Sequence, residues 1–191
     1  MCKPLQFRNC TNYEKLFLEA GAVRVLGIDC GGEYTGYGVV DQNSAALLSC
    51  VTYGAVALKR TQPLAQRLAC VFNQLSSIIE HHRPDTVAIE EVFYAVNAKS
   101  ALKLGQVRGV AMLTAAIHGC PIAEYAPLSI KSAVVGYGRA DKQQVQQMVT
   151  RLLSLNAAPE PFDAADALAI AICHLHTNAT LRRFHAAGAR G

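Results

Sequence analysis

The stretch Val25-Leu26-Gly27-Ile28-Asp29-Cys30-Gly31-Gly32 begins as an apolar run and ends in a carboxylate followed by small residues. Carboxylates are rarely buried without a partner, so an acid at the mouth of a hydrophobic strand costs stability. The glycines remove side chains where a large group could approach the backbone. An ordinary strand-ending turn also suits this stretch, because Asp and Gly are common in turns. The alternative is that Asp29 anchors a metal-binding cluster, which requires further acids elsewhere in the chain.

Periodicity on either side of this stretch predicts an α/β fold. Three strands at 23–29, 34–41 and 45–58 are joined by connections so short that they must be largely antiparallel. Later strands at 86–93 and 121–125 alternate with helical segments. We expect helices at 63–83, 97–118, 129–135, 141–155 and 162–176. This order predicts a five-stranded mixed sheet with helices on both faces.

Composition favours a single globular domain in a reducing compartment. The chain has 191 residues, of which 51% are hydrophobic and 17% are charged. Its net charge of +4 is compatible with a polyanionic partner. The seven cysteines form no Cys-x-x-Cys pair and lie mostly in apolar segments, which argues against a disulfide framework or a zinc site.

We expect a cytoplasmic protein with no membrane association. Residues 1–22 contain no apolar run of signal-peptide length, and the apolar segment 101–118 is interrupted by charged residues. We expect residues 1–22 to be an N-terminal extension; one hypothesis starts translation near Val23, where a GTG codon would initiate. The folded domain is expected at 23–177, followed by a basic flexible tail at 178–191.

Three further acids make the metal-site interpretation of Asp29 attractive. Glu90 lies near the end of another strand, and its carboxylate can meet that of Asp29 if the two strands are neighbours. Asp163 and Asp166 are three residues apart in a predicted helix, so they share a face. Simple N-capping by Asp163 is the alternative for that pair. The helix around the pair is almost wholly apolar, and no Lys or Arg occurs between Arg151 and Arg182, so a divalent cation is the simpler counter-charge.

Such a metal site would fit phosphodiester hydrolysis. Carboxylate oxygens suit Mg²⁺ or Mn²⁺. Two such ions, about 3.5–4 Å apart, activate water and stabilise the oxygens of an in-line displacement. Glu91 is not expected to join the site, because adjacent strand residues point to opposite faces.

Four ordered motifs now resemble those of the RuvC family, the bacterial Holliday junction resolvases with a ribonuclease H-like fold. The resemblance extends from about Val23 to His176, with the motifs Gly27–Gly31, Ala88–Phe93, Ser100–Gly109 and Asp163–Ala169. It implies a homodimeric DNA-binding endonuclease of recombination and repair that nicks two strands of like polarity in a four-way junction, using Mg²⁺. It also implies the RuvA–RuvB branch-migration complex as a partner. By motif position, the catalytic, metal-binding acids are Asp29, Glu90, Asp163 and Asp166.

The DNA-facing residues rest partly on the same resemblance. Phe93 matches an aromatic that stacks at the opened junction centre, with Tyr94 beside it, although a strand-end aromatic is more often part of a core. Lys131 and Lys142 match basic residues near the scissile phosphate; without the resemblance both would be ordinary surface lysines. Lys99 and Lys103 share a helix face with Gln106 that either contacts phosphates or is simply solvated. Arg108 points to the opposite side and is expected to be structural or interfacial.

The sequence departs from the family pattern at two positions near Asp29. Cys30 replaces the usual proline, which loosens the turn and is expected to place a thiol beside the site. Glu33 adds negative charge close to the expected DNA path.

Three other functions would fit parts of the sequence. An actin-like sugar kinase or ATPase would need a second phosphate loop that this chain lacks. A related nuclease acting on structured RNA and a catalytically silent junction-binding protein remain alternatives.

Overall fold

A computed structural model of the protein describes residues 22–91 and 98–188, without the side chains of residues 98, 99 and 180–188. At its centre is a five-stranded sheet in the order β3-β2-β1-β4-β5. The strands are β1 (Ala22–Cys30), β2 (Tyr34–Asn43), β3 (Leu48–Ala57), β4 (Thr86–Glu90) and β5 (Ile122–Tyr125). β1 pairs antiparallel with β2 and parallel with β4, so the predicted mixed sheet is confirmed, with β1 in the middle.

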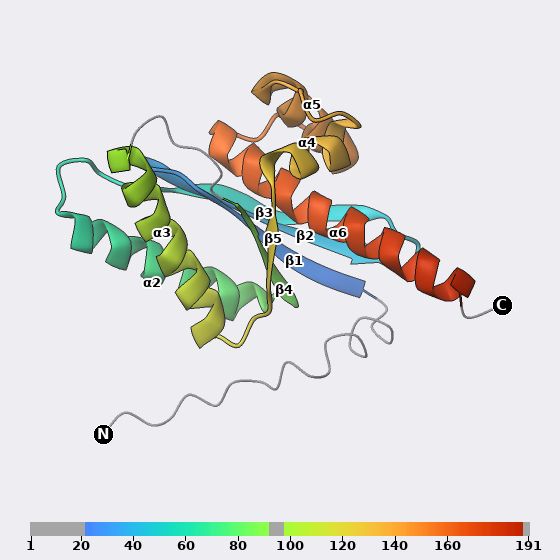
Figure 1. Cartoon of the computed structure of the whole chain (residues 1–191), viewed down its shortest axis with the longest axis horizontal. Helices are drawn as coiled ribbons and strands as arrows, with labels where there is room; N and C mark the ends of the chain where they lie inside the picture. Colours follow the sequence, from blue (N-terminus) through green and yellow to red (C-terminus); the bar gives the residue numbers. More distant parts are fainter. Residues whose placement is uncertain (1–21, 92–97, 189–191) are drawn as a thin grey trace.

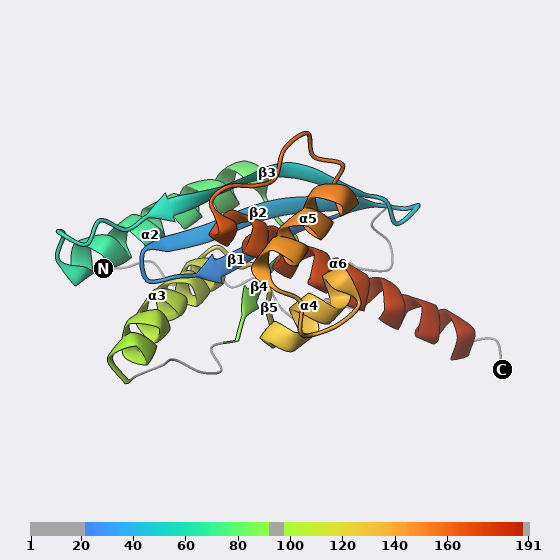
Figure 2. The same cartoon turned by 90° about the horizontal axis from the view of Figure 1, so that it is seen from above.

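Helices cover both faces of this sheet, as predicted (Figure 1, Figure 2). One face carries α2 (Leu64–His82) and α3 (Ala98–Ile117); the other carries α6 (Phe162–Gly188), with α4 (Pro127–Val135) and α5 (Lys142–Leu152) packed against α6. Alternate β1 side chains enter two cores: Val25 packs on the α6 side, whereas Leu26 and Ile28 pack under α2 and α3. Within the described ranges, no helix is long and apolar enough to span a membrane.

Several boundaries differ from the predictions for local reasons. The third strand begins at Leu48 because the Asn43 side chain accepts hydrogen bonds from the backbone of Ala45 and Leu47, which closes a turn. The helix α4 begins two residues early, at Pro127, a residue suited to a first helical turn. The expected cap at Asp141 is confirmed by reciprocal bonds with Gln144.

The last helix is longer than predicted. We expected the chain to leave the helix after His176 and become a flexible tail, but α6 continues to Gly188. The segment between these residues contains neither Gly nor Pro and is rich in good helix formers, which explains the continuation. The division into a domain and two terminal segments stays a prediction, and residues 1–21 lie outside the described residues.

Glycines on one face of β1 and β2 allow α6 to lie directly on the sheet. A Cβ atom added to Gly27 would overlap the backbone carbonyl of Ala167, and one added to Gly36 would overlap that of Asp163. This face of β2 carries no side chain at Gly36, and α6 occupies the space. Since Gly36 pairs with Asp29 across the β1–β2 ladder, this packing sets the first turn of α6 above the end of β1.

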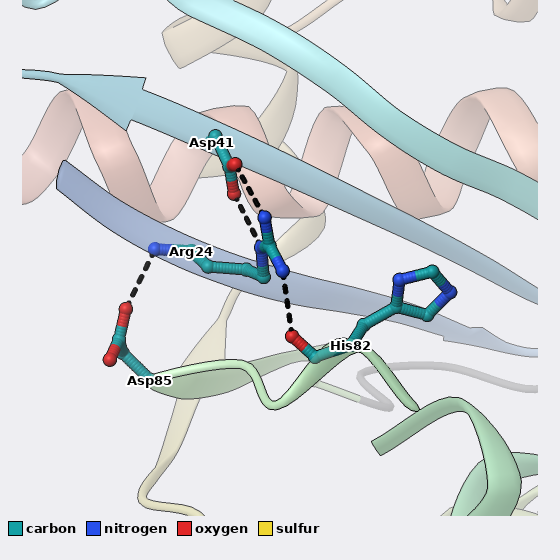
Figure 3. A network of polar contacts seen from close by, with 4 residues as sticks. All are labelled: Arg24, Asp41, His82 and Asp85. Atoms are coloured by element: carbon teal, nitrogen blue, oxygen red, sulfur yellow. Dashed lines mark hydrogen bonds and ion pairs between the residues drawn. The ribbon is translucent and has the colours of Figure 1, made fainter. Parts of the chain in front are cut away.

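A polar network closes the opposite end of the same strand (Figure 3). The Arg24 guanidinium donates to both carboxylate oxygens of Asp41, from Nε at 2.7 Å and from Nη2 at 2.8 Å. Its Nη1 donates to the backbone carbonyl of His82 at 2.9 Å, and the Arg24 amide donates to Asp85 at 2.8 Å. One residue of β1 thus ties β2, the end of α2 and the segment that leads into β4.

Candidate active site

Asp29 and Glu90 are brought together by the parallel pairing of their strands. Ile28 lies opposite Ile89 in the β1–β4 ladder, so the next residue on each strand is an acid at the carboxyl end. Both acids have the strand parity of residues in the core beneath α6, such as Val25 and Ala88. The neighbouring strands that the sequence interpretation required are therefore present.

The first turn of α6 supplies the other two acids. Asp163 lies over the loop after β1, where a Cβ added to Gly31 would lie 3.1 Å from its Oδ1. The helix begins at Phe162, so Asp163 is already inside it and does not act as the N-cap. Asp166 is one turn further along, with its Oδ2 3.4 Å from Nζ of Lys142. Two strands and one helix therefore contribute acids to the same place.

The charges of these acids act on one another. The pKa of Asp29 is raised to about 8, first by burial and then by the charges of Asp166, Glu90 and Asp163, against the opposing effect of Lys142. Burial is also the main cause that raises the pKa of Glu90, followed by repulsion from Asp166. The pKa of Asp166 is raised by burial and by Asp163, while Lys142 lowers it. The acids therefore lie close enough for their charges to act on one another.

Both predicted lysines lie beside the acids. Lys142, the first residue of α5, has an exposed side chain. Partial desolvation lowers its pKa, but Asp166, Asp29 and Asp163 together raise it above the ordinary value. Lys131, on α4, lowers the pKa of both Glu90 and Asp166. Two helices that pack on α6 therefore direct positive charge toward the acids.

The remaining predicted DNA contacts are less constrained by the structure. Phe93 and Tyr94 lie outside the described residues, as does the side chain of Lys99. Lys103 is exposed on α3, the helix that follows β4 on the other face of the sheet. The site assignments of these residues stay predictions.

Cys30 does not lie where we expected it. The thiol was expected beside the acids, but strand alternation turns it to the other face, where it packs in the core with Leu26 and Ile28. Burial raises the pKa of this thiol to about 12, so it is a buried apolar group. The negative charge of Glu33, expected near the DNA path, is paired with Arg60.

The donor set fits a hard divalent cation. It consists of carboxylate oxygens, and their unbalanced repulsion is the feature that such an ion relieves. In the described ranges, no three His, Cys, Asp or Glu side chains converge tightly enough to form a finished metal-binding group.

Comparison with known proteins agrees with this arrangement. The family model described as "Crossover junction endodeoxyribonuclease RuvC" matches residues 25–174, from β1 to the middle of α6. The chain belongs to the RuvC family. The RuvC proteins of Koribacter versatilis and Acidobacterium capsulatum are 63% and 55% identical to it, over 86% and 84% of this chain and 99% and 97% of theirs. A solved structure described as T. thermophilus RuvC in complex with Holliday junction substrate is 30% identical, with a TM-score of 0.76, and covers 83% of this chain and 96% of that one. The ribonuclease H-like fold expected from the sequence is thereby confirmed.

Two arginines of the far face were not assigned to the site by sequence reasoning. Arg108 was expected to be structural or interfacial, and its bond to the backbone carbonyl of Glu90 favours the structural alternative. Arg67 was overlooked, although it repeats at helical spacing with Val71 and Leu75 on the buried side of α2. The position of a charged residue among the apolar residues of a buried helix face is the sequence feature that could have identified it.

Proposed function

We propose that this protein resolves Holliday junctions in recombination and repair by nicking two strands of like polarity symmetrically. The observation that carries the proposal is the convergence of Asp29, Glu90 and Asp166 from β1, β4 and α6, with raised pKa values that reveal a shared, unbalanced charge. Membership of the RuvC family supports a nuclease rather than another use of such a cluster. The DNA bound by the related T. thermophilus protein supports a four-way junction as the substrate.

The four acids would hold Mg²⁺, for which Mn²⁺ could substitute, with two ions as the proposed number. The bound ions would supply a nucleophilic water and Lewis-acid stabilisation of the phosphodiester. Asp29 and Glu90 come from strands and Asp163 and Asp166 from a helix turn, so rigid elements set their spacing.

The lysines and aromatics have different proposed roles. Lys131 and Lys142 would stabilise negative charge that develops on the scissile phosphate. Phe93 and Tyr94 would stack on bases at the junction centre, and Lys99 and Lys103 would contact phosphates of a DNA arm. We expect the cytoplasm as the location, since the proposed substrate is recombining DNA.

We propose a homodimer that uses the outer face of α3. On this helix Leu102 and Leu113 are 66% and 56% exposed, and a Cβ added to Gly105 or Gly109 would meet nothing within 4 Å in the described part of the chain. An exposed apolar and smooth face suits close packing of a second copy. A dimer would also supply two active sites for two symmetric nicks. The RuvA–RuvB complex is proposed as a partner on family resemblance alone.

A junction-nicking assay tests the proposed function. A synthetic four-way junction labelled in turn on each strand should be cut in Mg²⁺ at symmetric positions on one strand pair, and remain uncut in EDTA. Structured RNA cut in preference to the junction would favour the ribonuclease alternative. Binding without cleavage in either Mg²⁺ or Mn²⁺ would favour the silent junction-binding protein.

A further inference from the structure

Arg108 holds the end of β4 from the face of the sheet opposite the acids. Its Nε donates to the backbone carbonyl of Glu90 at 3.1 Å, and its Nη2 pairs with the carboxylate of Glu124 on β5. The Arg108 side chain is 18% exposed, while that of Glu124 is 42% exposed. The guanidinium therefore joins the last residue of β4 to β5, at the point where the strand ladder ends.

Arg67 makes a similar contact at the end of β1. It is buried on α2, and its Nη2 donates to the backbone carbonyl of Gly32 at 3.3 Å, in the loop just after Asp29. Its Nε is buried without a hydrogen-bond partner, and no carboxylate pairs with it within the described ranges. Burying a cation without a carboxylate partner costs stability, and the hydrogen bond to the Gly32 carbonyl offsets part of that cost.

Neither arginine can touch the substrate from this position. Arg67 and Arg108 belong to α2 and α3, whereas the acids lie on the α6 side of the sheet. Arg108 acts instead through the backbone carbonyl of Glu90 itself. Arg67 acts through the backbone carbonyl of Gly32, three residues after Asp29. The rigid, planar guanidinium suits this role, because it presents several N–H donors in a fixed geometry.

We propose that Arg108 and Arg67 are positioning residues that set the separation of the Glu90 and Asp29 carboxylates. This inference rests on the proposed active site. The β1–β4 ladder ends at Ile28 and Ile89, one residue before the acids, so no strand pairing joins Asp29 to Glu90 directly. Each acid is paired only with its outer neighbour, Asp29 with Gly36 on β2 and Glu90 with Tyr125 on β5. The arginines add a second tie to these strand ends on the side away from the substrate. Groups that orient metal-binding side chains in this way typically alter metal affinity or activity by about 10–100-fold when removed.

The test compares Arg108→Met with Arg24→Met. Both changes remove a guanidinium that bonds a carboxylate and a backbone carbonyl, but at opposite ends of the sheet. Three quantities are measured: the single-turnover nicking rate, the junction dissociation constant in EDTA, and the dissociation constant for Mn²⁺ of the DNA-free protein by isothermal titration calorimetry. Thermal unfolding followed by circular dichroism reports the stability of each variant.

We expect Arg108→Met to slow nicking and weaken Mn²⁺ binding, each by about 10–100-fold, with the junction dissociation constant within about threefold of wild type. Arg24→Met should lose stability while keeping the nicking rate and the Mn²⁺ affinity. Arg108→Lys should recover part of the rate, since an ammonium can still donate to the Glu90 carbonyl. Arg67→Met should resemble Arg108→Met more weakly, in line with its longer bond.

Equal rates and Mn²⁺ affinities for wild type and Arg108→Met would overturn the positioning role and leave a purely structural tie. If Arg108→Met does not fold, Arg108→Lys decides the matter by the same measurements. Glu90→Gln distinguishes this failure from failure of the proposed site. If Glu90→Gln is inactive while Arg108→Met and Arg108→Lys behave as wild type, only the positioning inference fails. If Glu90→Gln nicks normally, the site assignment fails and the positioning inference with it.

Discussion

The two ends of β1 differ in how their charged side chains are paired. At the amino end, Asp41 accepts two guanidinium bonds from Arg24, and these bonds raise the pKa of Arg24 despite its partial burial. At the carboxyl end, Asp29 shares its surroundings with three other acids, and among the described residues the only ion pair made by these four is that of Asp166 with Lys142. The comparison shows that one end of the strand is balanced and secures the fold, while the other retains the excess negative charge that a cation site requires.

The sharpest way to break this comparison is to neutralise the carboxyl end. Asp29→Asn should reduce junction nicking by about a thousandfold, because a proposed metal-binding oxygen is lost while the basic surface is kept. Binding of the junction in EDTA should be unchanged. The variant should unfold at the same or a higher urea concentration than wild type, since one repelling charge is gone. Normal nicking by Asp29→Asn would refute the role given to this acid.

A methyl group at Gly36 tests how closely α6 must approach the acids. Gly36→Ala should lower the free energy of unfolding by about 3 kcal/mol, because the added Cβ overlaps the backbone of Asp163. It should also slow nicking, since the first turn of α6 must shift. Gly32→Ala is the control for stability, because its Cβ would meet nothing within 4 Å of the described structure. Similar urea unfolding curves for the two variants would show that the close approach is not required.

His174 on α6 is a buried polar group whose two ring nitrogens both have hydrogen-bond partners, so it can be compared with the two ends of β1. His174 contacts Tyr125 through Nδ1 at 2.9 Å and Asn178 through Nε2 at 2.7 Å, and burial lowers its pKa from 6.5 to about 4. Below pH 6.5 His174 binds a proton in the unfolded chain but stays neutral in the folded protein. Its contribution to the free energy of unfolding therefore falls as the pH drops toward 4. Between pH 6.5 and 5 this loss should be about 2 kcal/mol.

The measurement for His174 is a difference between two proteins. Urea unfolding of wild type and of His174→Gln is followed at pH 7.5, 6.5 and 5. The free energy of unfolding should fall more steeply with acidification in wild type, because glutamine does not titrate. Parallel curves for the two proteins would show that the histidine is not kept neutral in the folded state.

The smallest expected effect lies at the balanced end. Asp41→Asn should lower the free energy of unfolding by about 1 kcal/mol, since the pair with Arg24 is partly exposed and screened by solvent. The nicking rate should stay at the wild-type value, as measured in the same single-turnover assay. A slower nicking rate in this variant would mean that the two ends of β1 are coupled, and the distinction between them would fail.

Local patterns in the sequence were sufficient for much of the fold and for part of the candidate site. A continuous apolar run predicted β1, and a cap was predicted at Asp141 from its residue type. The spacing of Asp163 and Asp166 placed both on one helical face, because a helix turn has a known period. The continuation of α6 beyond His176 was missed, since frequent arginines were read as a tail rather than as helix formers.

By itself, the sequence determined which groups share a strand or a helix, because side-chain direction follows the short periods of the backbone. Only the tertiary structure decided which elements meet. It placed β4 beside β1, laid α6 on Gly27 and Gly36, and turned Cys30 away from the acids. It also brought Arg108 to the carbonyl of Glu90 from the far side of the sheet. These contacts join residues distant in sequence, and they depend on how whole elements pack, which no local period encodes.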